Sequence, residues 1–164
     1  MFRPAIQRVE VLVVMALISL VVFYTASSLK VETQQPAYEI KIAAAERMAS
    51  AMQILKDSRM EAAVFMDDVN DPNETALIGR QFTYITTDEG DLDSKISVLD
   101  PNVAAMVVDY LTRASVVRGD TVAVTLTGSM PGGNLAVICA LEEMGIHPVI
   151  LSSVGASQWG ANIE

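Results

Sequence analysis

The sequence predicts an α/β protein in which an N-terminal transmembrane helix and a long second helix precede a small Rossmann-like layer domain with a parallel sheet. Three observations predict this fold. Residues 11–24 form an almost unbroken apolar run. Residues 37–64 repeat apolar side chains every three or four positions, as an amphipathic helix does. Residues 120–160 then read as a strand, a loop of small residues, a helix and a second strand, which together make one βαβ unit.

The composition bounds the function before any motif is considered. The chain has 164 residues, enough for one domain and an appendage, and a formal net charge of −9. An acidic balance argues against nucleic acid as a partner, because phosphate backbones require a basic surface. The single cysteine, Cys139, allows no intramolecular disulfide and is expected to be a small buried hydrophobe. Because no set of metal ligands has a recognisable spacing, we expect no metal. The loop over residues 128–133 matches neither the Walker A motif nor Gly-x-Gly-x-x-Gly, and we expect no cofactor.

Residues 1–29 are expected to be a membrane anchor or a signal segment. A spanning helix needs about 20 residues, and the apolar run reaches that length when its weakly polar flank is included. Arg3 and Arg8 precede the run, so we expect a cytoplasmic N-terminus, a single pass through the cell membrane and an extracytoplasmic remainder. An uncleaved anchor is favoured over a cleaved signal, for which Ala26 and Ser28 would supply small residues. A type IV pilin-like start, with Glu10 opening the helix, ranks third.

Residues 30–36 form a linker to the main domain, 37–164, which begins with a long helix over residues 37–64. Its predicted core stripe consists of Ile40, Ala44, Met48, Met52 and Leu55. Residues 67–74 then form an acidic loop. They lack the residue order of an EF-hand, so turn formation is favoured over calcium binding.

A short strand is predicted over residues 82–87, followed by a turn over residues 88–91. Asp100 and Pro101 have the pattern of a helix start, with an N-cap and a proline at the first helical position. The predicted apolar face of this helix consists of Val103, Met106, Val107, Tyr110, Leu111 and Ala114.

The βαβ unit is predicted from two strands, over residues 121–127 and 149–154, that are apolar enough to be buried. Residues 128–133 break the first strand with turn residues. A helix over residues 134–144 follows and ends at Gly145. Its helically spaced residues are Leu135, Ile138, Cys139, Leu141 and Glu142.

A ligand site is predicted where these strands end, because ligands of open parallel sheets bind beyond the carboxyl ends of the strands. Glycines there let backbone N–H groups approach a ligand, and a helix N-terminus favours an anion such as a carboxylate or a phosphate. A purely structural turn explains the same residues equally well. His147 is expected at the opposite end of the sheet. The candidate ligand-binding residues are Thr86, Thr87, Gly128, Ser129, Gly132, Gly133, Asn134, Ser152, Ser153, Gly155 and Ser157.

Four segments, residues 70–79, 85–87, 128–134 and 150–162, resemble those of the poly-γ-glutamate system proteins. These are bacterial proteins encoded with the machinery that synthesises capsule-type poly-γ-glutamate. The resemblance implies a membrane-anchored accessory protein whose partners are the membrane, the polymer or the synthesis machinery. It also implies that the domain continues beyond residue 163, so we expect an incomplete C-terminal part and exposed apolar sheet surface.

The resemblance implies a pathway but no reaction, so we expect a binding protein rather than an enzyme and assign no catalytic residue. Two alternatives remain open. The first is a hydrolase or transferase with Ser129 or Ser153 as the nucleophile, although a base is missing and no Gly-x-Ser-x-Gly elbow is present. The second is a sugar-phosphate-binding domain similar to sugar isomerase (SIS) domains.

Overall fold

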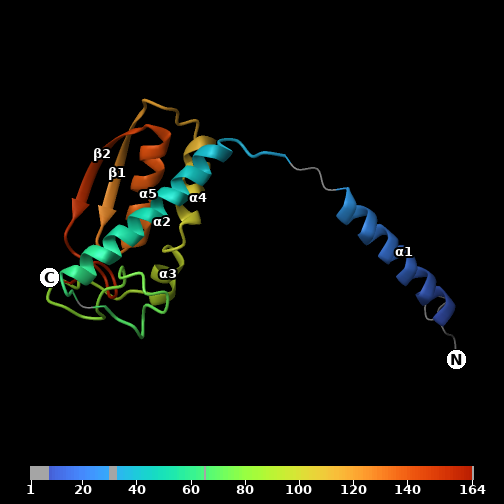
Figure 1. The fold of residues 1–164 in the computed structure, drawn as a ribbon, viewed down its shortest axis with the longest axis horizontal. Helices are drawn as coiled ribbons and strands as arrows, with labels where there is room; N and C mark the ends of the chain where they lie inside the picture. The colour runs from blue at the N-terminus through green and yellow to red at the C-terminus, as the bar shows by residue number, and fades with distance from the viewer. Residues whose placement is uncertain (1–7, 30–32, 65, 164) are drawn as a thin grey trace. The chain divides into compact units, whose positions relative to one another are not determined.

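The computed structural model describes residues 8–29, 33–64 and 66–163. The chain divides into two compact units, Met1–Gln34 and Gln35–Glu164. The elements, in chain order, are α1 (Val9–Ser28), α2 (Tyr38–Glu61), α3 (Leu92–Ser97), α4 (Asn102–Arg113), β1 (Thr121–Thr127), α5 (Pro131–Met144) and β2 (His147–Ser153) (Figure 1). The α/β class is therefore confirmed.

Helix α1 makes up most of the first unit. It has 20 residues, its most apolar 18-residue window has a mean hydropathy of 2.4, and none of its residues is buried. At 1.5 Å per residue it is about 30 Å long, which matches the hydrocarbon core of a bilayer. By length and composition it can cross a membrane, although a signal sequence near an N-terminus passes the same test.

Helices α2, α4 and α5 build the core of the second unit together with one face of β1. Residues from all three helices form one buried cluster. Small side chains bring the helices close, among them Ala44, Ala104, Ala136 and Ala140, none of which is exposed to solvent. The half-buried Val122 and Val124 of β1 pack against this cluster. Figure 1 shows the two strands on one side of the unit, with the three helices beside one another.

A partly buried ion pair connects α2 to α4. The Nζ atom of Lys41 lies 2.6 Å from Oδ1 of Asp109 and also donates to Oε1 of Gln35 at 3.1 Å. On the other side of the carboxylate, Nε of Arg113 lies 2.7 Å from Oδ2. The hydrogen bond from Lys41, followed by the charges of Arg113 and Lys41, holds the pKa of Asp109 below its usual value against the effect of desolvation.

Strands β1 and β2 are parallel, with Thr121 opposite His147 and Thr127 opposite Ser153. The predicted βαβ unit is thus confirmed. The prediction of two buried strands is wrong: β1 alternates between exposed and half-buried residues, and every residue of β2 is exposed. The reason is that the sheet has only two strands within the described residues, and the core cluster includes side chains from β1 but none from β2.

The prediction of a strand over residues 82–87 is wrong. The region is a turn with a single parallel bridge between Thr86 and Ala156. The backbone N–H of Thr83 donates to Oγ1 of Thr86 at 2.9 Å, and the N–H of Thr86 donates to the carbonyl of Thr83 at 3.2 Å. A threonine hydroxyl that bonds its own backbone competes with ladder formation, so the segment closes on itself.

Helix α3 was not predicted, because residues 88–91 were interpreted only as a turn. Asp91 is its N-cap, and the carboxylate accepts the backbone N–H of Ser94 at 2.7 Å. The hydroxyl of Ser94, followed by its backbone N–H, lowers the pKa of Asp91 below its usual value by hydrogen bonding to the carboxylate. The sequence contains the N-cap residue Asp91, but the helix has only 6 residues and shows no clear helical periodicity.

The predicted helix faces agree with the observed ones only in part. In α4 the buried residues are Ala104 and Val108, whereas Met106 and Tyr110 are 45% and 59% exposed. In α2, Ala44 and Met48 are buried as predicted, but Ile40 and Leu55 lie at the exposed margin. In α5, Cys139 and Leu141 are buried as predicted, while Ile138 is exposed. The helices contact one another at alanines. Which face of a helix is buried therefore depends more on how closely the helices can approach than on the size of the apolar side chains.

The acidic loop is organised by its own carboxylates. Asp67 accepts the backbone N–H groups of Val69 and Asn70 at 3.2 and 3.0 Å. Asp71 is buried and accepts the N–H of Ala76 at 2.7 Å together with the hydroxyl of Thr75. These are the local turn contacts that Asp residues favour.

Candidate functional site

The carboxyl ends of the two strands lie side by side. Thr127, the last residue of β1, is the partner of Ser153, the last residue of β2. In Figure 1 both arrowheads point toward the loops that surround α3. Ser129 and Ser153 therefore follow strands that end at the same edge of the sheet. His147 lies at the amino end of β2, opposite Thr121, as predicted.

Local hydrogen bonds hold the loop after β1. The N–H of Ser129 donates to Oγ1 of Thr127 at 3.0 Å. The side-chain amide of Asn134 reaches back to the carbonyl of Thr127 at 2.7 Å, and the Asn134 N–H donates to Met130 at 2.9 Å. These bonds set the position where α5 begins. Gly133 lies in its first turn, where a Cβ atom would meet nothing closer than Cβ of Met130 at 3.6 Å.

The chain after β2 folds over this loop. The backbone N–H of Ser157 donates to Oγ of Ser129 at 3.0 Å, and the N–H of Ala161 donates to the carbonyl of Gly128 at 2.6 Å. A Cβ atom on Gly160 would approach the Gly128 carbonyl oxygen to 2.5 Å. Gly128 and Gly160 thus allow two loops to pack closely, which is a structural role.

Lys95 lies beneath both loops and is the residue that sequence reasoning missed. It is only 3% exposed. Its Nζ atom donates to the carbonyl oxygen of Ser129 and lies 2.9 Å from Oγ of Ser157. Desolvation lowers the pKa of Lys95, and the charge of Asp91 offsets this in part. No sequence pattern pairs a lysine with a serine 62 positions away.

The other predicted residues divide into three groups. Thr86 and Thr87 join the loops: Thr86 Oγ1 accepts the amide of the fully buried Asn162 at 3.2 Å, and the Thr87 N–H donates to Ala156 at 2.9 Å. A Cβ atom on Gly155 would come within 2.6 Å of Cγ2 of Thr87.

Gly132 instead packs against the chain that follows α3, where a Cβ atom would lie 2.7 Å from the carbonyl oxygen of Val98. Ser152 and Ser153 are exposed at the end of β2. The structure therefore brings Ser129 and Ser157 together around Lys95, with the backbone of Gly128 beside them. It leaves Ser152 and Ser153 on the surface.

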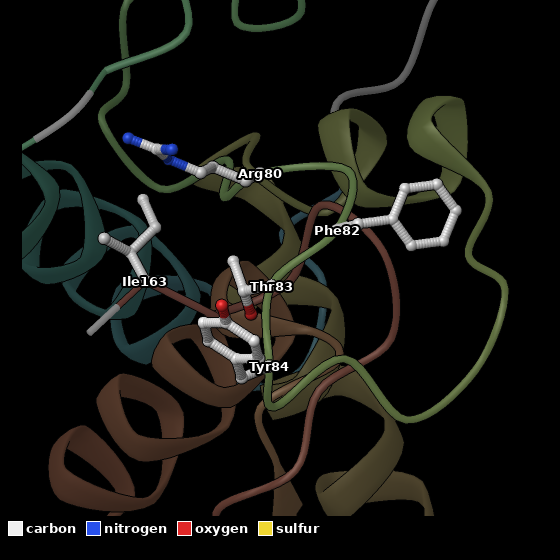
Figure 2. A pocket seen from close by; sticks show the side chains of 5 residues that line it. All are labelled: Arg80, Phe82, Thr83, Tyr84 and Ile163. Carbon is white, nitrogen blue, oxygen red and sulfur yellow. The ribbon is translucent and has the colours of Figure 1, made fainter.

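A separate cavity of about 530 Å³ is lined by Arg80, Phe82, Thr83, Tyr84 and Ile163 (Figure 2). In Figure 2 the ring of Phe82 points away from Arg80 and Ile163. Tyr84 is fully exposed. Because Ser129, Ser157 and Lys95 do not line this cavity, it is distinct from the loop site.

Neither a reactive thiol nor a metal site is indicated in the described part of the chain. Cys139 is buried, and desolvation raises the pKa of its thiol, which disfavours the reactive thiolate. Among the residues that the structure describes, no group of three or more His, Cys, Asp or Glu side chains is placed to hold a metal ion.

Comparison with protein-family models gives no match, and comparisons with curated proteins and with solved structures give none either. The function must therefore be inferred from the residues of this chain.

Proposed function

We propose that the protein is a membrane-anchored accessory protein of poly-γ-glutamate synthesis or export, and that it binds a carboxylate-rich ligand at the loops after β1 and β2. The observation that supports a ligand site most directly is the convergence of the Ser129 and Ser157 loops at one sheet edge, beside the start of α5. The pathway itself is supported by the sequence resemblance of four segments.

An anionic ligand suits the start of α5 for a general reason. The first N–H groups of a helix have no partner within the helix, and the helix dipole places partial positive charge there. Gly133 leaves space at this position. The same features would serve a phosphate, which is the sugar-phosphate alternative.

A titration of the full chain in detergent with a γ-linked glutamate oligomer tests this proposal. Trp159 is the only tryptophan and lies next to Gly160, so its fluorescence reports on the loops. We expect saturable binding that weakens at least tenfold in Gly133→Glu, because the new carboxylate would occupy the helix start. Gly133→Gln is the matched neutral control and should bind more tightly than Gly133→Glu.

Equal binding by the two variants would contradict the proposed position of the anion. Inorganic phosphate is the second probe. If phosphate saturates the fluorescence change and the oligomer causes none, the sugar-phosphate alternative replaces the polymer. Deletion of the gene tests the pathway, since unchanged polymer yield, length and surface retention would reject it.

The membrane location is supported by α1 and by the positive charges before it. We propose that the N-terminus is cytoplasmic and the second unit extracytoplasmic. A reporter that is active only outside the cytoplasm, fused after Glu164, should be active. A cytoplasmic reporter signal would contradict this orientation and would favour a phosphorylated cytosolic ligand.

A further inference from the structure

We propose that Ser157 and Lys95 form a nucleophile–base pair that transfers acyl groups from esters or amides. The proposal goes beyond ligand binding and does not depend on the identity of the ligand. Its basis is the position of the Lys95 amino group, 2.9 Å from Oγ of Ser157 and almost completely removed from solvent. A serine needs such a partner, because its hydroxyl is a weak nucleophile at its ordinary pKa.

The contacts of Lys95 suit a neutral amine. Its two hydrogen-bond partners are the Ser129 carbonyl oxygen and the Ser157 hydroxyl, and neither is a carboxylate. A carbonyl oxygen can only accept, so the amine donates one N–H to Ser129. Its lone pair is then available to accept the O–H of Ser157. Burial disfavours the ammonium form more than the charge of Asp91 favours it, which leaves the amine able to act as a base.

Ser129 is the positioning residue for both members of the pair. Its carbonyl oxygen binds Lys95, and its Oγ atom accepts the backbone N–H of Ser157 at 3.0 Å. One residue therefore fixes the base and the nucleophile relative to each other. The serines that the sequence suggested as nucleophiles have other places: Ser129 supports the pair, and Ser153 lies on the exposed end of β2.

The reaction balances with water as the second substrate. Lys95 Nζ takes the proton from Ser157 Oγ as the oxygen attacks the acyl carbon. The tetrahedral intermediate collapses, and the leaving alcohol or amine takes that proton from Lys95. Water then attacks the acyl-serine, with Lys95 again accepting a proton and returning it to Ser157 Oγ. The net result is hydrolysis of one ester or amide bond.

Covalent labelling of the full chain in detergent micelles tests the pair. A fluorophosphonate probe should label wild type, and mass spectrometry should place the adduct on Ser157. Ser157→Ala should abolish that adduct, whereas Ser50→Ala, which changes an exposed serine of α2 outside the site, should leave the rate unchanged. Lys95→Arg retains a cationic donor but cannot supply a base, so it should label at least 100-fold more slowly with an unchanged circular dichroism spectrum.

The pH profile separates a base from a structural lysine without any variant. In wild type the labelling rate of Ser157 should rise with pH and then level off as the amine becomes fully neutral. Labelling of Ser157 no faster than of the exposed Ser50 would overturn the proposal. A folded Lys95→Arg protein that labels at the wild-type rate would overturn it as well. If that variant does not fold, a wild-type rate that is independent of pH overturns it.

Discussion

The amino group of Lys95 connects the end of α3 to the two loops at the edge of the sheet. Because this amine is buried, its protonation affects the stability of the second unit. The effect on stability follows from linkage: a group that binds its proton less tightly in the folded state favours folding as the pH rises.

The free energy of unfolding should therefore increase with pH across the interval between the lowered folded pKa of Lys95 and the ordinary lysine pKa. In this interval the unfolded chain holds the proton and the folded chain does not. Urea denaturation at several alkaline pH values measures this slope. Lys95→Met, which cannot be protonated, should flatten it, and parallel curves for the two proteins would contradict the assignment.

Asn162 makes a second residue-scale prediction. It is completely buried, and its amide accepts the N–H of Arg80 at 2.9 Å and donates to the Arg80 carbonyl at 2.7 Å. Asn162→Ala removes these two hydrogen bonds and the one to Thr86 Oγ1, at about 0.5–1.5 kcal/mol each, so we expect a loss of about 2–4 kcal/mol in urea denaturation. The exposed Asn73→Ala is the control and should change stability by less than about 0.5 kcal/mol. A loss in Asn162→Ala that is no larger than in the control would show that the amide does not hold these loops.

At the scale of elements, the βαβ unit was predictable because its signals are local. The run of β-branched and apolar residues, the small-residue break and Gly145 all lie within a few positions of the element they define. β1 was predicted with its observed bounds, and α5 begins three residues earlier than expected, at Pro131. The contacts of Lys95 were not predictable, because they join segments that meet only through the tertiary fold.

The ion pair between α2 and α4 predicts acid sensitivity. Because the pKa of Asp109 is depressed in the folded state, its stabilising effect is present above the unfolded carboxyl pKa and is lost as the pH falls through the folded value. Asp109→Asn should lower Tm at neutral pH and lose less stability on acidification than wild type. The exposed Asp68→Asn is the control and should follow the wild-type acid curve. Equal acid sensitivity of Asp109→Asn and wild type would exclude this ion pair as the source.

At the scale of the whole molecule, the two units have contrasting surfaces. Every residue of α1 is unburied, whereas α2, α4 and α5 share one core. Strand β2 exposes apolar residues, including Val149 and Leu151. The buried helix faces were predictable only in part: Ala44 and Met48 of α2 are buried as expected, whereas Met106 and Tyr110 of α4 are exposed.

Membrane extraction tests the role of α1. The chain should remain in the membrane fraction after alkaline carbonate treatment. Replacing Leu17 and Val21 with arginine places charges in the middle of the helix, at a cost of about 2.5–3.5 kcal/mol each, and should release the protein. Ser28→Arg, at the helix end, should have little effect because a terminal arginine side chain can reach the interface. Release of wild type by carbonate would contradict an uncleaved anchor.

The hydrogen bonds of Ser129 to Lys95 and Ser157 can form only when the chain is folded. Lys95 and Ser157 are drawn from stretches 34 and 28 positions to either side of Ser129. A newly made or translocating polypeptide holds them far apart, and each then behaves like any solvated lysine or serine. Reactivity at Ser157 would thus arise only on completion of the tertiary structure, so an unfolded chain would carry no activated nucleophile at this position.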